Sequence, residues 1–75
     1  MKLKILVIDD EHTIRETIKL RLSKWGYDVH LASDGTSAIE LLSNKNFDVV
    51  ISDIKMPGIP GNELVKIIKE RFPDI

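Results

Sequence analysis

The 75-residue chain contains no cysteine, which excludes a disulfide scaffold, a cysteine-based zinc site and a thiol nucleophile. It has no basic surplus either, since 11 lysines and arginines against 12 aspartates and glutamates give a formal net charge of −1. Bulk charge therefore gives no reason to expect direct nucleic-acid binding or attachment to an acidic membrane surface.

Long apolar runs are also missing. The run from Ile5 to Ile8 stops at Asp9, whereas a signal-peptide core needs roughly 7–15 apolar residues and a membrane span about 20. A hydrophobic share of 43% with 31% charged residues is typical of a globular domain. We expect a single small soluble domain over residues 1–75, located in the cytoplasm.

Three segments have the apolar pattern of β-strands. Residues 3–8 and 47–52 are almost continuously apolar, which is typical of strands covered on both faces, whereas residues 27–32 alternate, as an edge strand does. Helical patterns separate them, and this alternation implies parallel strands joined by right-handed crossovers. The edge character of the second strand, together with the buried character of the first and third, predicts the sheet order 2-1-3. In this α/β fold the carboxyl ends of strands 1 and 3 flank a topological switch point.

The apolar spacing predicts a helix after each strand. The first spans residues 12–25, and Gly26 is placed for a left-handed cap at its C-terminal end. The second follows a turn at which Ser33 or Asp34 caps the helix. The third runs from about residue 62 to 72. The residues predicted to face the core are Ile14, Ile18, Leu22, Trp25, Ala38, Leu41, Leu42, Leu64, Ile67, Ile68 and Phe72.

Carboxylates follow two of the predicted strands, with Asp9 and Asp10 after the first and Asp53 after the third. In the 2-1-3 order these residues meet at one edge of the sheet. Two such charges about 5 Å apart repel by roughly 3 kcal/mol at an effective dielectric constant near 20, so the group needs a cation or a raised pKa. Hard oxygen ligands suit Mg²⁺. The alternative is that each acid simply caps a helix.

Several short motifs, in this order and spacing, resemble the receiver domain of bacterial two-component response regulators. The resemblance covers essentially the whole chain and implies a flavodoxin-like fold. The motifs are Val7-Ile8-Asp9-Asp10-Glu11, Asp53 at the end of an apolar strand, Met56-Pro57-Gly58, and Gly61 before a helix.

The resemblance implies a role for each residue of the acidic edge. Asp53 would accept a phosphoryl group from a sensor histidine kinase, so the protein would be a phosphoprotein of a phosphorelay and not an enzyme. Asp10, Asp53 and the backbone carbonyl of Lys55 would bind Mg²⁺ directly, and Asp9 would act mainly through water. The metal would neutralise the charge that builds on the transferring oxygens.

A complete receiver of this family has five strand–helix units, whereas this chain has three, so the resemblance describes an amino-terminal (βα)₃ portion. The family's hydroxyl and lysine contacts to the phosphoryl group come from the other units, and phosphoryl transfer is therefore expected to be impaired. One alternative is a structural or engineered half-domain fragment whose main behaviour is self-assembly. Another is a Mg²⁺-dependent phosphatase that forms its own aspartyl phosphate. The open edge of strand 47–52 predicts a homodimer.

Overall fold

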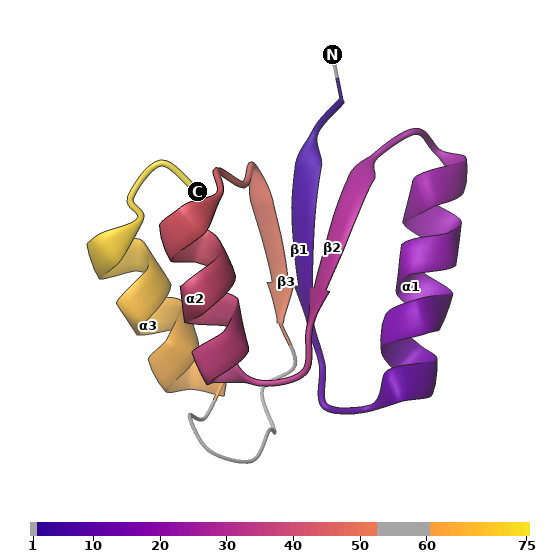
Figure 1. The fold of residues 1–75 in the computed structure, drawn as a ribbon. Coiled ribbons are helices and arrows are strands. Elements are labelled where there is room, and N and C mark those ends of the chain that lie inside the picture. Colours follow the sequence, from indigo (N-terminus) through magenta and orange to yellow (C-terminus); the bar gives the residue numbers. More distant parts are fainter. Residues whose placement is uncertain (1, 53–60) are drawn as a thin grey trace.

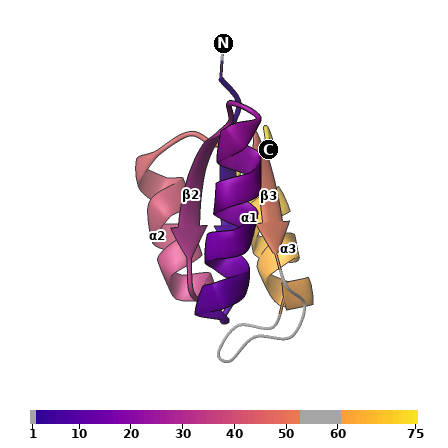
Figure 2. The ribbon, with the colours of Figure 1, turned by 90° about the vertical axis from the view of Figure 1, so that its right-hand side faces the viewer.

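The computed structural model describes residues 2–52 and 61–75 and has three layers (Figure 1). Helix α1 covers one face of the sheet, and α2 and α3 cover the other (Figure 2). In the part of the chain that is described, no helix is long and apolar enough to cross a bilayer. The elements are β1 (Lys4–Ile8), α1 (His12–Lys24), β2 (Asp28–Ala32), α2 (Gly35–Asn44), β3 (Val49–Ser52) and α3 (Gly61–Arg71).

The sheet has the order β2-β1-β3 with all strands parallel, as the sequence predicts. Strand β1 is central because it pairs with both others. Its last residue, Ile8, lies in register with Ala32 of β2 and with Ser52 of β3. The three strands therefore end at one level, and the residues that follow them leave the sheet at the same edge.

The hydrophobic core lies on both faces of β1, because side chains alternate along a strand. Leu6 and Ile8 face α2 and α3, whereas Ile5 and Val7 face α1. The α2–α3 side holds the larger cluster: Leu6, Ile8, Ala32, Ala38, Leu42, Phe47, Leu64 and Ile68. The α1 side holds Ile5, Val7 and Val29, with Ile18, Leu22, Tyr27 and Leu31 packed against them.

Two residues of α1 and its C-cap that were predicted to be core are exposed. Trp25 is 75% exposed and Ile14 is 41% exposed, whereas Ile18 and Leu22 pack on the sheet as expected. Trp25 follows the last residue of the helix, so the helical spacing no longer places it over the sheet. Ile14 lies in the first turn of α1, which extends past the ends of the strands (Figure 1). The prediction for these two residues is wrong.

Strand β3 is covered on one face only, so the predicted burial on both faces is also wrong. Val50 packs against the larger cluster, but Val49 is 40% exposed and Ile51 is 39% exposed. The reason is the position of α1, which packs against β2 and β1. The face of β3 on the α1 side therefore stays open.

Two local motifs fix the ends of helices as the sequence suggests. Gly26 has a φ of 89°, its N–H donates to the carbonyl of Ser23, and the next residue, Tyr27, donates to the carbonyl of Leu22. These two bonds form a Schellman motif, which requires a left-handed residue. At the start of α2, Asp34 and not Ser33 is the cap, since its Oδ1 accepts a 2.7 Å hydrogen bond from the N–H of Ser37.

Candidate functional site

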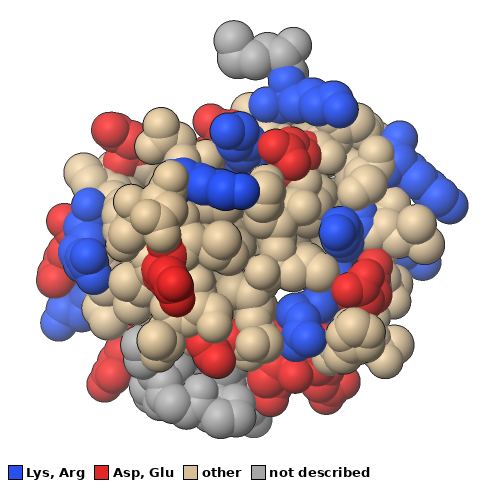
Figure 3. All heavy atoms as spheres, viewed as in Figure 1, with Lys and Arg blue, Asp and Glu red and all other residues tan. Residues whose placement is uncertain are grey.

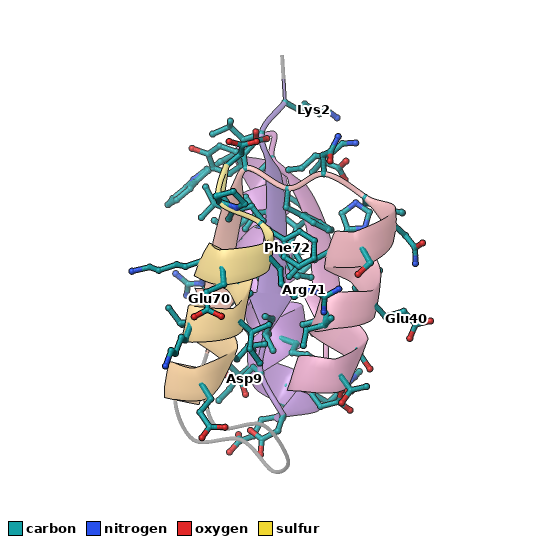
Figure 4. The ribbon with its side chains drawn as sticks, turned by 90° about the vertical axis from the view of Figure 1, so that its left-hand side faces the viewer. Lys2, Asp9, Glu40, Glu70, Arg71 and Phe72 are labelled. Carbon is teal, nitrogen blue, oxygen red and sulfur yellow. The ribbon has the colours of Figure 1, made fainter. Side chains whose placement is uncertain are left out.

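The candidate site is the edge of the sheet at which the three strands end. Asp9 and Asp10 follow β1 at this edge, and Ser52, the last residue of β3, lies beside Ile8. Figure 4 shows Asp9 at the level where α2 and α3 begin. In Figure 3 acidic side chains gather along the lower edge of the molecule, beside the residues drawn in grey. The structure thus confirms that the acids after β1 lie at the topological switch point.

Asp9 is held by three hydrogen bonds and is only 8% exposed. Its backbone N–H donates to the carbonyl of Ala32 at 3.1 Å, which extends the β1–β2 ladder by one residue. Its Oδ1 accepts from the N–H of Glu11 at 2.9 Å. Its backbone carbonyl accepts from Nη1 of Arg15 at 2.7 Å. Both the main chain and the carboxylate of Asp9 are therefore fixed before any ligand binds.

The bond from Glu11 also decides between two interpretations of Asp9. Helix α1 begins at His12, and Glu11 is its N-cap residue. Because the Asp9 carboxylate bonds to the N–H of Glu11, it closes a turn two residues on and does not cap the first turn of the helix. The helix-cap interpretation fails for this acid.

Asp34 follows β2 at the same edge, and for it the cap interpretation is correct. The backbone N–H of Ser37 donates to its carboxylate and holds its pKa below the ordinary value. Since this carboxylate is engaged by the first turn of α2, it contributes negative charge to the edge but is oriented toward its own helix.

The remaining predicted site residues, Asp53 and Lys55, lie outside the described residues, as does the Met56-Pro57-Gly58 motif. In residues 2–52 and 61–75 no three acidic or histidine side chains form a group that could hold a metal. Asp9 and the exposed Asp10 carry carboxylates, and hard oxygen groups of this type are the ligands that Mg²⁺ prefers. The chemistry of these two side chains is compatible with the predicted cation, and the ligand set itself stays a prediction.

Sequence reasoning missed Arg15, whose side chain reaches back from α1 to the main chain of Asp9. The available signal was its position one turn into a helix that starts directly after the acidic pair. A long, positively charged side chain at that position can reach back to the end of the strand, but the apolar periodicity of the helix does not predict this contact.

Comparison with known proteins identifies the family. The family model described as the response regulator receiver domain matches residues 5–75. The chain belongs to this family of response regulator receiver domains. Among curated relatives, response regulator MprA of Mycobacterium sp. strain KMS is 37% identical over all 75 residues, which are 33% of the length of that protein. The chain thus spans about a third of the length of the curated relatives it matches.

Solved structures with this fold include two with informative partners. Response regulator TrrA of Thermotoga maritima, in complex with Mg²⁺-BeF, is 43% identical with a TM-score of 0.92 over 99% of this chain and 64% of that one. The same regulator in complex with histidine kinase ThkA is also 43% identical with a TM-score of 0.92, and the match covers 99% of this chain and 63% of that one. Chemotaxis response regulator CheY4 of Vibrio cholerae is 37% identical with a TM-score of 0.92, and the match covers 95% of this chain and 59% of that one.

Proposed function

We propose that this chain is a phosphoacceptor module of two-component signal transduction, which accepts a phosphoryl group from a sensor histidine kinase on Asp53. The observation that carries the proposal is the fixed Asp9 at the carboxyl edge of the sheet, level with the end of β3. Asp53 is the residue that follows β3 in the sequence. A relative of this chain forms a complex with a histidine kinase, which supports the choice of partner.

The proposed metal is Mg²⁺, bound by Asp10, Asp53 and the backbone carbonyl of Lys55, with Asp9 acting mainly through water. When bound, this cation would offset the negative charge of the transferring phosphoryl oxygens. The structural relative in complex with Mg²⁺-BeF supports this assignment. The Asp53 carboxylate would form the new O–P bond as the P–N bond to the kinase histidine breaks.

Direct phosphorylation tests the proposal. The chain is incubated with Mg²⁺ and acetyl phosphate, and intact mass and peptide mapping follow the addition of one phosphoryl group. We expect Mg²⁺-dependent modification that Asp53→Asn abolishes, because an amide side chain cannot form the new O–P bond that the carboxylate forms. Modification that survives Asp53→Asn would refute the assignment.

We propose that the module is not an enzyme and acts in the cytoplasm without binding membranes or nucleic acid directly. The phosphatase alternative would release phosphate continuously from an added phosphomonoester, in molar excess over the protein. A receiver stops at one phosphoryl group per chain until that group hydrolyses. A phosphate-release assay run beside the mass measurement therefore separates the two.

We also propose that the 75-residue polypeptide forms a homodimer through the outer edge of β3. No other described strand lies on that side of β3, and Val49, Ile51 and Val65 are 39–42% exposed around it. An antiparallel pair centred on Val50 would place Val49 of each copy opposite Ile51 of the other. The strand contains no charged residue, so nothing in it opposes pairing with a second copy.

Sedimentation of the polypeptide at several concentrations tests this second proposal. We expect dimers that Ile51→Lys weakens, because a lysine on an edge strand opposes edge-to-edge pairing. Leu20→Lys is the matched control, since Leu20 is 60% exposed on the outer side of α1. A folded monomer at high micromolar concentration would contradict the proposal, and so would equal weakening by both variants.

A further inference from the structure

Arg15 connects α1 to the acidic edge. It is half-buried, and its Nη1 donates a 2.7 Å hydrogen bond to the backbone carbonyl of Asp9. Its Nη2 lies 3.5 Å from Nδ1 of His12. Its own N–H donates to the carbonyl of Glu11 and makes the first hydrogen bond of the helix. One residue thus connects the start of α1 to the main chain of Asp9.

Asp9 has three hydrogen-bond partners, and only one of them bonds through a side chain that a substitution can remove. The bonds with Ala32 and Glu11 use backbone N–H or C=O groups, so they survive most side-chain changes. The bond from Arg15 comes from a side chain and is charge-assisted, which makes it the stronger type. Without it, the Asp9 carbonyl loses its donor in a residue that is almost fully buried.

Fixing the Asp9 carbonyl also fixes its carboxylate. The carboxylate closes a tight turn onto the N–H of Glu11, and that turn spans the peptide group that Arg15 holds. If the peptide group rotates, the turn opens and the carboxylate loses its orientation. Residues that orient the groups around a metal commonly change its affinity by 10- to 100-fold when their support is lost. Asp9 would act in this way, through the water between its carboxylate and the cation.

The charge of Arg15 has the opposite effect, because a guanidinium beside the acidic edge repels an incoming cation. The guanidinium, however, points at a main-chain carbonyl and neighbours His12. Its hydrogen bonds are short-ranged and directional, whereas its repulsion of a cation at an exposed edge is screened by water and salt. The orienting effect should therefore dominate.

We propose that Arg15 is a positioning residue that holds the β1–α1 turn and the Asp9 carboxylate in the geometry that binds a divalent cation. This inference rests on the proposed function, because it concerns the same acidic edge. Arg15 acts through Asp9 and does not contact the cation or the phosphoryl group.

The test compares Arg15→Met, which keeps an apolar stem, with Arg15→Lys, which keeps a cationic donor of shorter reach. Arg21→Met, at an exposed position of the same helix, is the matched control. Amide NMR spectra during Mg²⁺ titration give the dissociation constant, and amide exchange of Glu11 without metal reports the turn directly. Circular dichroism shows whether each variant folds.

We expect Arg15→Met to weaken Mg²⁺ binding at least about 10-fold and to accelerate exchange of the Glu11 amide. Arg15→Lys should recover part of both, and Arg21→Met should change neither. Unchanged or tighter Mg²⁺ binding in a folded Arg15→Met variant would overturn the inference. If the unmodified chain binds no Mg²⁺, the metal part of the proposed function fails, and so does the role of Arg15 in cation binding. If Arg15→Met fails to fold, the Arg15→Lys comparison decides.

Discussion

Replacing Leu64 by alanine should remove a large part of the stability of this domain. Leu64 lies on α3, is 0% exposed and belongs to the larger core cluster between the sheet and α2–α3. Its neighbour Val65 is 42% exposed on the same helix. Val65→Ala is therefore a matched control with the same backbone environment and the same new residue.

The expected magnitude follows from burial. The substitution deletes the equivalent of about three methylene groups at about 0.8 kcal/mol each, and the cavity that remains adds to this loss. We expect Leu64→Ala to lower the free energy of unfolding by about 3–5 kcal/mol. A domain of this size has about 4–11 kcal/mol in total, so the variant is near the limit of folding. Val65→Ala should change stability by about 0.5 kcal/mol or less, partly because alanine is the better helix former.

Urea denaturation and thermal melts, both followed by far-ultraviolet circular dichroism, measure the two variants. At about 4–8 °C per kcal/mol, Leu64→Ala should lower Tm by at least about 12 °C. Equal shifts in the two variants would mean that α3 does not pack through Leu64, and the core described above would be wrong. A change in the denaturant slope of either variant would indicate a different unfolded state and would require a second core substitution, Leu42→Ala.

Three further substitutions test local features. Gly26→Ala should cost about 1–2 kcal/mol of stability, purely from its positive φ, because no atom lies within 4 Å of the added Cβ; an unchanged Tm would contradict this. Trp25→Ala should change stability by about 0.5 kcal/mol or less in thermal melts, because Trp25 is exposed. A large loss of stability would mean that Trp25 is part of the core after all. Asp34→Ala should lower Tm above about pH 4, where the native carboxylate is charged, and the difference from the unmodified chain should shrink as the pH falls below that value. The sign follows from the lowered pKa of Asp34 in the folded state, and a difference that grows in acid would refute it.

The sequence predicted the features that depend on neighbours along the chain. These local features are the periodicity of strands and helices, the left-handed Gly26 and a helix cap at Ser33 or Asp34. The structure confirms them and shows that the cap is Asp34. The order β2-β1-β3 was also predicted correctly, from the alternating second strand and the continuous apolar runs of the other two, although β3 is covered on one face only. The position of Asp9 at the switch point is a consequence of that order.

The errors concern packing between elements. Ile14, Trp25 and the outer face of β3 are exposed because α1 covers only part of the sheet, and no local pattern states how far a helix extends over its neighbours. Arg15 was missed because its contact depends on the path of one long side chain. The assignments of Asp53 and Lys55 stay predictions that rest on the resemblance and on family membership.

The central position of β1 has a consequence for how the chain folds. Lys4 and Asp48, which are 44 residues apart, exchange hydrogen bonds at the start of the β1–β3 pair. Pairing at that separation requires a large loop to close before its contacts stabilise anything, which slows folding. During synthesis β1 emerges before β3, so the side of β1 that pairs with β3 stays uncovered until β3 has followed it. Strand β1 therefore becomes fully buried only after β3 has emerged, and in that interval a chaperone would have the most exposed apolar surface to protect.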